Sequence, residues 1–206
     1  MAILQLPNLD ESVLAALQHF SGEAPTRFRP ESFSFPLVIG SGNAYNTGLI
    51  IFGKQSAVIT NESGCREVAA AYRPLMKAGR MKDAVVISAS GEKDSIWEIG
   101  LAKKLGLKTT LLTCNGSSTS AQLADKTLIY AKLPEPYTYN TSTYLGMLLG
   151  SSGENPASIV RFIKRLRLPD FRSYSAYAFI LPDEYAAIAP MLEIKRHELF
   201  GPYVSL

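Results

Sequence analysis

Hydrophobic and polar positions follow two alternating patterns between residues 36 and 150. Short β-branched runs are each followed by a longer amphipathic stretch, which is typical of parallel strands joined by helical crossovers. The apolar runs predict five strands, at Leu37–Ile39, Ala57–Thr60, Ala84–Ser88, Thr109–Thr113 and Thr127–Ala131. The stretches between them predict helices near Ala44–Phe52, Arg66–Ala78, Asp94–Leu105 and Thr119–Leu123. The fold class is therefore α/β, a three-layer sandwich with a five-stranded parallel sheet.

The segment before this sheet predicts a helix and a loop. Leu9 to Phe20 carries apolar residues at helical spacing, with Asp10 or Ser12 as candidate N-caps, and this helix is expected to pack on the sheet or on a partner. The three prolines between Ser21 and Pro36 exclude a continuous helix or a central strand there. We expect a leading helix and a wrapping loop over residues 1–35.

The segment after the fifth strand predicts a domain boundary. A helix over Asn140–Leu149 is followed by Gly150–Pro156, which has the composition of a loop, so the sheet domain is assigned to residues 36–150. Residues 151–206 predict a tail with a helix, a strand and a second helix, at Ala157–Leu166, Tyr177–Leu181 and Asp183–Phe200. A lone strand and helix bury little alone. The tail therefore packs on the first domain, pairs with another chain, or opens an incomplete second lobe.

Charge and composition exclude several classes of function. The 206 residues hold 21 Lys and Arg against 18 Asp and Glu, a net charge of +3, so no basic surface for nucleic acid is expected. No apolar stretch reaches the roughly 20 residues that a bilayer requires, and Met1–Leu6 lacks the pattern of a signal peptide. Cys65 and Cys114 lie far apart without neighbouring histidines, so no metal site is predicted and a reducing cytoplasm is expected.

Two loops carry the candidate chemistry, Gly40–Tyr45 and Ser88–Asp94. Each follows a predicted strand, opens a helix, and is rich in Gly and Ser. Small residues let the backbone approach a ligand, and the N–H groups of a helix start favour an anion, so a phosphate is the natural guest. In a sheet of order 2-1-3-4-5 both loops border one crevice. The alternative is that the glycines merely permit tight turns, with Ser90 as an ordinary N-cap.

Nucleotide cofactors are disfavoured by the same loops. Gly40 and Gly42 are followed by Tyr45 where a dinucleotide fingerprint has its third glycine, and no GxxxxGK[ST] is present. We expect no cofactor.

Three segments resemble motifs of one family. Ser88-Ala89-Ser90-Gly91-Glu92-Lys93 is similar to a phosphate loop S-x-S-G-E-[ST], Gly40–Ala44 is a looser match to G-x-G-[ST]-S, and Glu135–Ser142 resembles E-[IL]-x-V-A-x-T-K. These motifs, in this order over about residues 35 to 150, resemble the sugar isomerase domain family, in particular the isomerase domain of glucosamine-6-phosphate synthase. The resemblance implies a flavodoxin-like sheet of order 2-1-3-4-5 that binds phosphorylated sugars.

The resemblance also implies which residues bind the substrate. Lys93 stands where the family has Thr or Ser, Asn43 replaces a hydroxyl residue, and Ser142 replaces a Lys. The implied binding residues are Gly40, Ser41, Gly42, Asn43, Ser88, Ala89, Ser90, Gly91, Lys93 and Asn140.

The tail is similar to the start of a second domain of this kind. Ile194–Phe200 resembles L-K-L-K-E-I, whose Glu is the base in isomerising members, and this implies Glu198 as a base that moves a proton between C1 and C2. His197 is the implied counterpart of a ring-opening histidine. Against this, Leu181–Tyr185 stands where a glycine loop belongs, and Glu198 is equally well explained as a solvated residue near a helix end.

The expected function is binding of a phosphorylated sugar, with two alternatives beyond it. One is catalysis, as aldose–ketose isomerisation or as deamination or isomerisation of an amino-sugar phosphate. The other is a non-catalytic regulatory module that senses a phosphosugar. A homodimer formed through the leading helix and the tail is also expected, because Phe179, Ile180, Met191 and Ile194 otherwise expose apolar surface.

Overall fold

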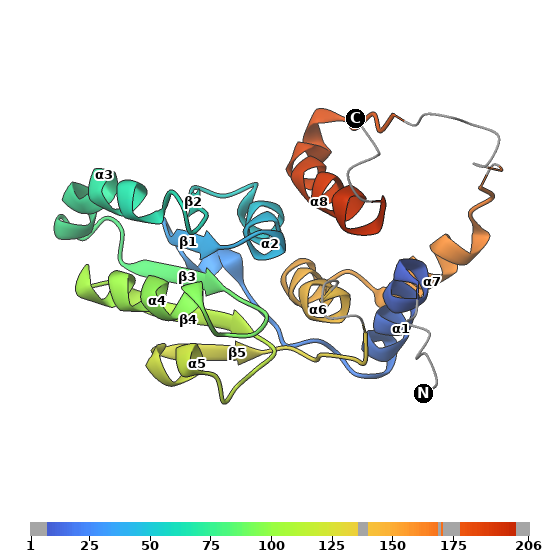
Figure 1. The fold of residues 1–206 in the computed structure, drawn as a ribbon, viewed down its shortest axis with the longest axis horizontal. Coiled ribbons are helices and arrows are strands. Elements are labelled where there is room, and N and C mark those ends of the chain that lie inside the picture. The colour runs from blue at the N-terminus through green and yellow to red at the C-terminus, as the bar shows by residue number, and fades with distance from the viewer. Residues whose placement is uncertain (1–7, 136–139, 169, 171–177, 201–206) are drawn as a thin grey trace.

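The computed structural model describes residues 8–135, 140–168, 170 and 178–200, with side chains in the last helix described as far as Ile194. Five strands form one parallel sheet in the order β2-β1-β3-β4-β5 (Figure 1). This confirms the predicted α/β class and strand order. The strands are β1 (Leu37–Gly40), β2 (Val58–Thr60), β3 (Asp83–Ile87), β4 (Lys108–Thr113) and β5 (Lys126–Ile129).

Helices cover both faces of the sheet because successive strand residues point to opposite faces. Leu37 and Ile39 of β1 pack toward α3 (Cys65–Lys77), α4 (Asp94–Lys104) and α5 (Thr119–Leu123). Val38, between them, packs on the other face toward α2 (Asn43–Phe52) and α6 (Thr141–Ser152). The crossovers from β1 and β3 therefore leave on opposite faces, which creates a topological switch point between these two strands (Figure 1).

The leading helix α1 (Leu9–Gly22) packs on helices of its own chain. Ala16, Leu17 and Phe20 form one buried cluster with Leu149 of α6, and α7 (Pro156–Arg165) covers that cluster. The predicted caps Asp10 and Ser12 are wrong. Asn8 caps the helix instead, because its extended backbone precedes the first turn and Glu11 accepts its N–H at 2.8 Å, so that both form a capping box.

The wrapping loop contains no strand and only a short 3-10 turn, η1 (Pro30–Ser32), as its prolines predict. Phe28 anchors the loop by packing its ring against Phe33 and Phe52. At the other boundary, α6 continues to Ser152, so the connection to α7 is shorter than the predicted loop Gly150–Pro156. The division into residues 1–35, 36–150 and 151–206 stays a prediction.

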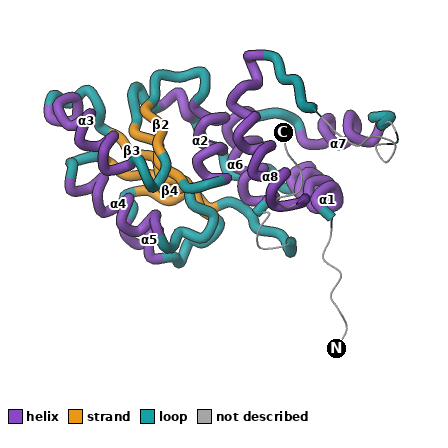
Figure 2. The backbone as a smooth tube through the Cα atoms, turned by 45° about the horizontal axis from the view of Figure 1, so that its top comes forward, coloured by secondary structure: helices purple, strands orange, loops and turns teal. Residues whose placement is uncertain are grey.

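The tail differs from its predicted form. Residues 178–181 form no strand, and Tyr177 lies outside the described residues. Phe179 and Ile180 are 66% and 92% exposed, and within the described ranges no strand pairs with this segment. β propensity alone does not make a strand without such a partner. The predicted single helix Asp183–Phe200 is divided into the 3-10 helix η3 (Asp183–Ile188) and α8 (Ala189–Phe200). Both contact α2, so the tail packs back on the sheet domain (Figure 2).

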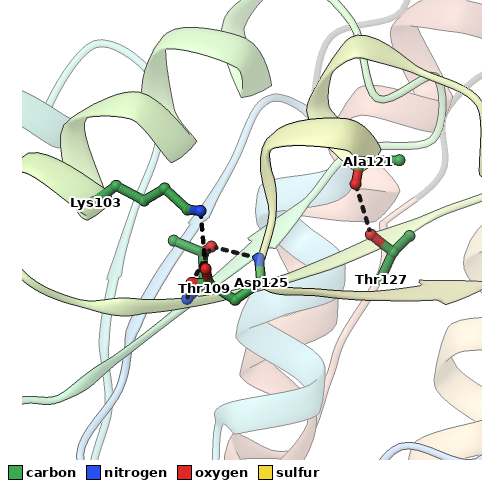
Figure 3. Close-up of polar contacts among 5 residues, drawn as sticks. All are labelled: Lys103, Thr109, Ala121, Asp125 and Thr127. Carbon is green, nitrogen blue, oxygen red and sulfur yellow. Dashed lines mark hydrogen bonds and ion pairs between the residues drawn. The ribbon is translucent and has the colours of Figure 1, made fainter.

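One polar cluster ties three elements together at the edge of the sheet away from the switch point. Asp125, just before β5, accepts hydrogen bonds from the N–H and hydroxyl of Thr109 at 2.7 and 2.8 Å (Figure 3). The Lys103 ammonium at the end of α4 lies 2.8 Å from the same carboxylate. The hydrogen bond from Lys103 and those from Thr109 lower the pKa of Asp125 to about 2.

No helix within the described ranges is both long and apolar enough to cross a bilayer. Neither Cys65 nor Cys114 forms a disulfide.

Candidate functional site

A cavity of about 200 Å³ lies at the carboxyl ends of β1 and β3, at the switch point. Six of the predicted binding residues line it: Ser41, Ser88, Ala89, Ser90, Lys93 and Asn140. Four others, Gly40, Gly42, Asn43 and Gly91, belong to the same two loops but are not among the lining residues. The two loops therefore converge on one crevice, as the strand order requires.

Both loops enter their helices through the same unusual backbone conformation. Gly42, which precedes α2, has φ 54° and ψ −119°, and Lys93, which precedes α4, has φ 57° and ψ −119°. Neither residue caps its helix with a side chain. Two helix starts thus present their positive dipole ends near the cavity without a capping side chain, which is the arrangement that favours an anion.

This conformation is cheap for Gly42 and costly for Lys93. A residue with a Cβ rarely adopts positive φ, and such strain is retained where the surrounding structure enforces it. The strained lysine places a cationic side chain at the cavity wall, beside the start of α4.

The loop Ser88–Asp94, called the serine loop below, is held in shape by its own hydroxyls. Ser88 Oγ accepts from the N–H of Gly91 at 3.2 Å, and Ser90 Oγ accepts from the N–H of Glu92 at 3.3 Å. In both contacts the hydroxyl is the acceptor, so its own hydrogen remains for donation to an anion. Gly91 has φ 67°, and a Cβ there would overlap the hydroxyl of Ser118.

The loop between β4 and α5 buttresses the serine loop. The Glu92 carboxylate accepts from the N–H of Thr119 at 3.0 Å, at the first residue of α5. The hydroxyls of Ser95 and Ser120 lie 2.8 Å apart in a buried contact. The Glu of the S-x-S-G-E segment is therefore explained by a structural contact with the next crossover.

The third matched segment has a structural explanation as well. The Glu135 carboxylate accepts from the N–H groups of Thr141 and Ser142, at 2.8 and 3.0 Å, and contacts the Ser142 hydroxyl. These are the first N–H groups of α6, so Glu135 caps that helix from outside it. Asn140, at φ 44°, directly precedes Thr141 and lines the cavity. Residues 136–139, including Tyr137 and Tyr139, lie outside the described part.

Sequence reasoning missed Lys132 and Glu98, which also line the cavity. Lys132 follows β5, and the cavity lies at the carboxyl ends of the strands. Its place directly after the fifth predicted strand could therefore have indicated it as a site residue. Glu98 lies on α4 and is 1% exposed. Burial, with the nearby carboxylates of Asp94 and Glu62, raises the pKa of Glu98 to about 7. The pattern of α4 gave no signal for a buried carboxyl.

The predicted catalytic residues Glu198 and His197 fall in α8, whose backbone contacts α2, but their side chains lie outside the described part. Their roles stay predictions. Within the described ranges, no group of three His, Cys, Asp or Glu side chains is placed to hold a metal ion.

Comparison with known proteins gives a match in structure only. No family model matches the sequence, and no curated protein sequence matches it. Among solved structures, glucosamine-6-phosphate deaminase from Thermotoga maritima has a TM-score of 0.53 and 15% identity, over 91% of this chain and 63% of that chain. The Vibrio vulnificus NanR protein complexed with ManNAc-6P has a TM-score of 0.47 and 18% identity, over 90% and 62%.

A third match is the C-terminal domain of glucosamine-fructose-6-phosphate aminotransferase from Francisella tularensis, with a TM-score of 0.46 and 15% identity, over 90% of this chain and 50% of that chain. The chain spans about half the length of several matched structures. At these identities the deaminase match establishes a shared fold. The fold that the loop motifs implied is therefore confirmed.

Proposed function

We propose that this chain binds a phosphorylated sugar at the switch-point cavity, with the phosphate on the serine loop. The observation that carries the proposal is the convergence of anion-binding groups on one cavity: the starts of α2 and α4, the hydroxyls of Ser88 and Ser90, and the side chains of Lys93 and Lys132. Charge-assisted hydrogen bonds of this type contribute roughly 1.5–3 kcal/mol each. The phosphate is expected to dominate the affinity.

The sugar is assigned to polar lining residues outside the serine loop. Asn140 and Tyr144 line the cavity from the start of α6, and Ser41 lines it from the first loop. Amide and hydroxyl groups suit sugar hydroxyls because they both donate and accept. The name of the Thermotoga deaminase, which shares the fold, gives glucosamine 6-phosphate as its substrate, which supports a phosphosugar as the ligand class.

Binding is tested by calorimetry with glucose 6-phosphate, fructose 6-phosphate and their unphosphorylated parents. We expect the phosphorylated sugars to bind at least tenfold more tightly, because one retained charge-assisted hydrogen bond exceeds the 1.4 kcal/mol of a tenfold change. Lys93→Met is expected to weaken phosphosugar binding, whereas Lys104→Met, at the far end of α4, serves as the control. Equal affinity for fructose and fructose 6-phosphate contradicts the proposal.

The second part of the proposal is that the chain also catalyses a reaction of the bound phosphosugar. We infer that Glu198 acts as the base that takes a proton at C2 and returns it at C1, with His197 assisting ring opening, if α8 or a neighbouring copy brings them to the cavity. The contact between α8 and α2 supports the first route, because α2 begins at the cavity loop. The alternative is a regulatory module that binds the ligand without turning it over.

Proton exchange at C2, followed by NMR in deuterated water, separates these alternatives. If the chain is an isomerase, wild type exchanges the proton and Glu198→Gln does not, while phosphosugar affinity stays within a few-fold, because binding and proton transfer use different groups. Glu193→Gln, an exposed residue of the same helix, is the matched control. Absence of exchange in wild type favours the regulatory module.

A further inference from the structure

Glu98 is a buried carboxyl that the proposed phosphate contacts do not use. It projects from the second turn of α4 into the wall of the cavity that Ser41 and Ser88 also line. Its Oε1 atom is buried without a hydrogen-bond partner. Because buried polar groups in folded proteins are almost always paired, an unpaired oxygen in a cavity wall points to a partner supplied by a ligand.

The groups around Glu98 favour its neutral form. Burial raises the pKa of Glu98, and the carboxylates of Asp94, on the same helix, and of Glu62, in the loop before α3, raise it further. Cys65, at the start of α3, is buried, and its own pKa is raised to about 11, so the thiol is uncharged near neutral pH. Acidic neighbours and burial thus act in the same direction.

Basic residues also lie on or beside the elements around Glu98. Arg66 lies with its guanidinium carbon 5.3 Å from the centre of the Trp97 ring. Lys93 precedes α4 and Lys132 follows β5, and both line the cavity at the anion-binding loops. None of these cations is among the groups that shift the pKa of Glu98.

We propose that Glu98 binds the sugar in its protonated form, donating a hydrogen bond to a sugar oxygen, and that ligand binding is therefore coupled to uptake of a proton by this carboxyl. The proposal rests on the proposed function, because it needs a phosphosugar in this cavity. A dianionic phosphate in a cavity of about 200 Å³ repels an ionised Glu98, so the complex holds the proton to a higher pH than the free protein does.

This coupling makes phosphosugar affinity fall as the pH rises above neutrality. Free Glu98 loses its proton as pH rises through about 7, so above that pH binding must first restore it. Affinity is then expected to fall roughly tenfold per pH unit until the pKa of the complex is reached. The second pKa of a phosphate monoester is near 6, so the ligand itself is almost fully dianionic above pH 7 and does not produce this slope.

The test is calorimetry with glucose 6-phosphate from pH 6.5 to 8.5, in two phosphate-free buffers that differ in ionisation enthalpy. Wild type is expected to lose roughly fivefold in affinity between pH 7 and 8, because Glu98 is already half ionised at pH 7, and to take up close to one proton per ligand at pH 8. Glu98→Gln, which keeps an uncharged donor, is expected to show neither effect. Glu67→Gln removes an exposed carboxyl of α3 and is expected to match wild type.

Inorganic phosphate identifies the part of the ligand that Glu98 contacts. At pH 6.5, Glu98→Ala is expected to weaken glucose 6-phosphate binding by about tenfold and to leave inorganic phosphate binding within twofold, because only the sugar loses a contact. Equal losses for both ligands overturn the sugar contact.

The outcomes separate this inference from the proposed function. A wild-type affinity that is flat above pH 7, or a slope that persists in Glu98→Gln, overturns the role of Glu98 and leaves the phosphosugar site standing. Absence of binding by both sugar phosphates at every pH overturns the site and the inference together.

If Glu98→Gln fails to fold, 13C NMR of the glutamate carboxyls in wild type replaces it. One carboxyl must then titrate near pH 7 and shift upward with glucose 6-phosphate, and its absence overturns the inference.

Discussion

At the scale of single residues, Lys93 combines a strained backbone with a position in the cavity wall. Its φ of 57° matches that of Gly42 in the equivalent position of the first loop, where glycine meets the same requirement without a Cβ. Strain of this kind costs on the order of 1–3 kcal/mol. We propose that a lysine is retained there because its charge binds the phosphate of the ligand.

Lys93→Gly is therefore expected to stabilise the fold by about 1 kcal/mol and to weaken glucose 6-phosphate binding. Urea unfolding measures the first effect and calorimetry the second. Lys93→Met is the matched control, because it removes the charge and keeps the strain, so it should weaken binding without stabilising. A Lys93→Gly protein less stable than wild type contradicts this account of the strain.

The candidate site was predictable where small polar residues follow a strand. Ser88, Ser90 and Lys93 were expected at the cavity because the carboxyl end of a strand and the start of a helix fix their place. Glu98 was not, because a carboxyl within a helix is usually exposed, and only the tertiary structure shows that this turn faces a cavity.

At the scale of elements, the five strands were predicted within about two residues, because each is a short run of apolar or β-branched residues followed by a helical pattern, and the central strands β1 and β3 are apolar on both faces. The tail strand was predicted from the same composition and is wrong. Phe179 and Ile180 have β propensity, but a strand also needs a partner to pair with, which a local pattern does not encode. The cap of α1 was misplaced for a related reason, since Asn8 lies before the apolar periodicity begins.

Asp125 connects three elements through one side chain, so Asp125→Asn is expected to destabilise the protein by about 1 kcal/mol at pH 7, after allowance for its partial exposure. The pKa of Asp125 is lowered to about 2, so its stabilisation is fully present above pH 3.8 and is lost as pH falls through 2.

Urea unfolding of wild type and Asp125→Asn at pH 7 and pH 2.5 measures this difference, with Glu67→Gln as a control for the loss of an exposed carboxylate. The gap between wild type and variant is expected to narrow at the lower pH. A gap that stays constant contradicts an electrostatic role for this carboxyl.

At the scale of the whole molecule, several large apolar side chains remain exposed after the tail has packed on α2. Phe162 and Leu168, in and after α7, are 65% and 70% exposed, and Phe179 and Ile180 remain open as well. The apolar face of α1, in contrast, is covered by its own chain. We propose that the chain forms a homodimer that buries the residues around α7 and 178–181.

Light scattering is expected to give the mass of a dimer, and Phe162→Lys or Ile180→Lys is expected to shift it toward the monomer without loss of helical circular dichroism. Leu75→Lys, an exposed apolar position on the distant helix α3, is the control. A wild-type monomer at every concentration contradicts the dimer.

The packing of α1 on α6 and α7 also has a consequence for synthesis on the ribosome. Ala16, Leu17 and Phe20 leave the ribosome well before α6 and α7, which bury them and are completed only at Ser152 and Arg165. At about 5–20 residues per second, on the order of 10 s pass between these events. During that interval the apolar face of α1 stands open on the nascent chain, where a chaperone that recognises short apolar helices is able to bind it.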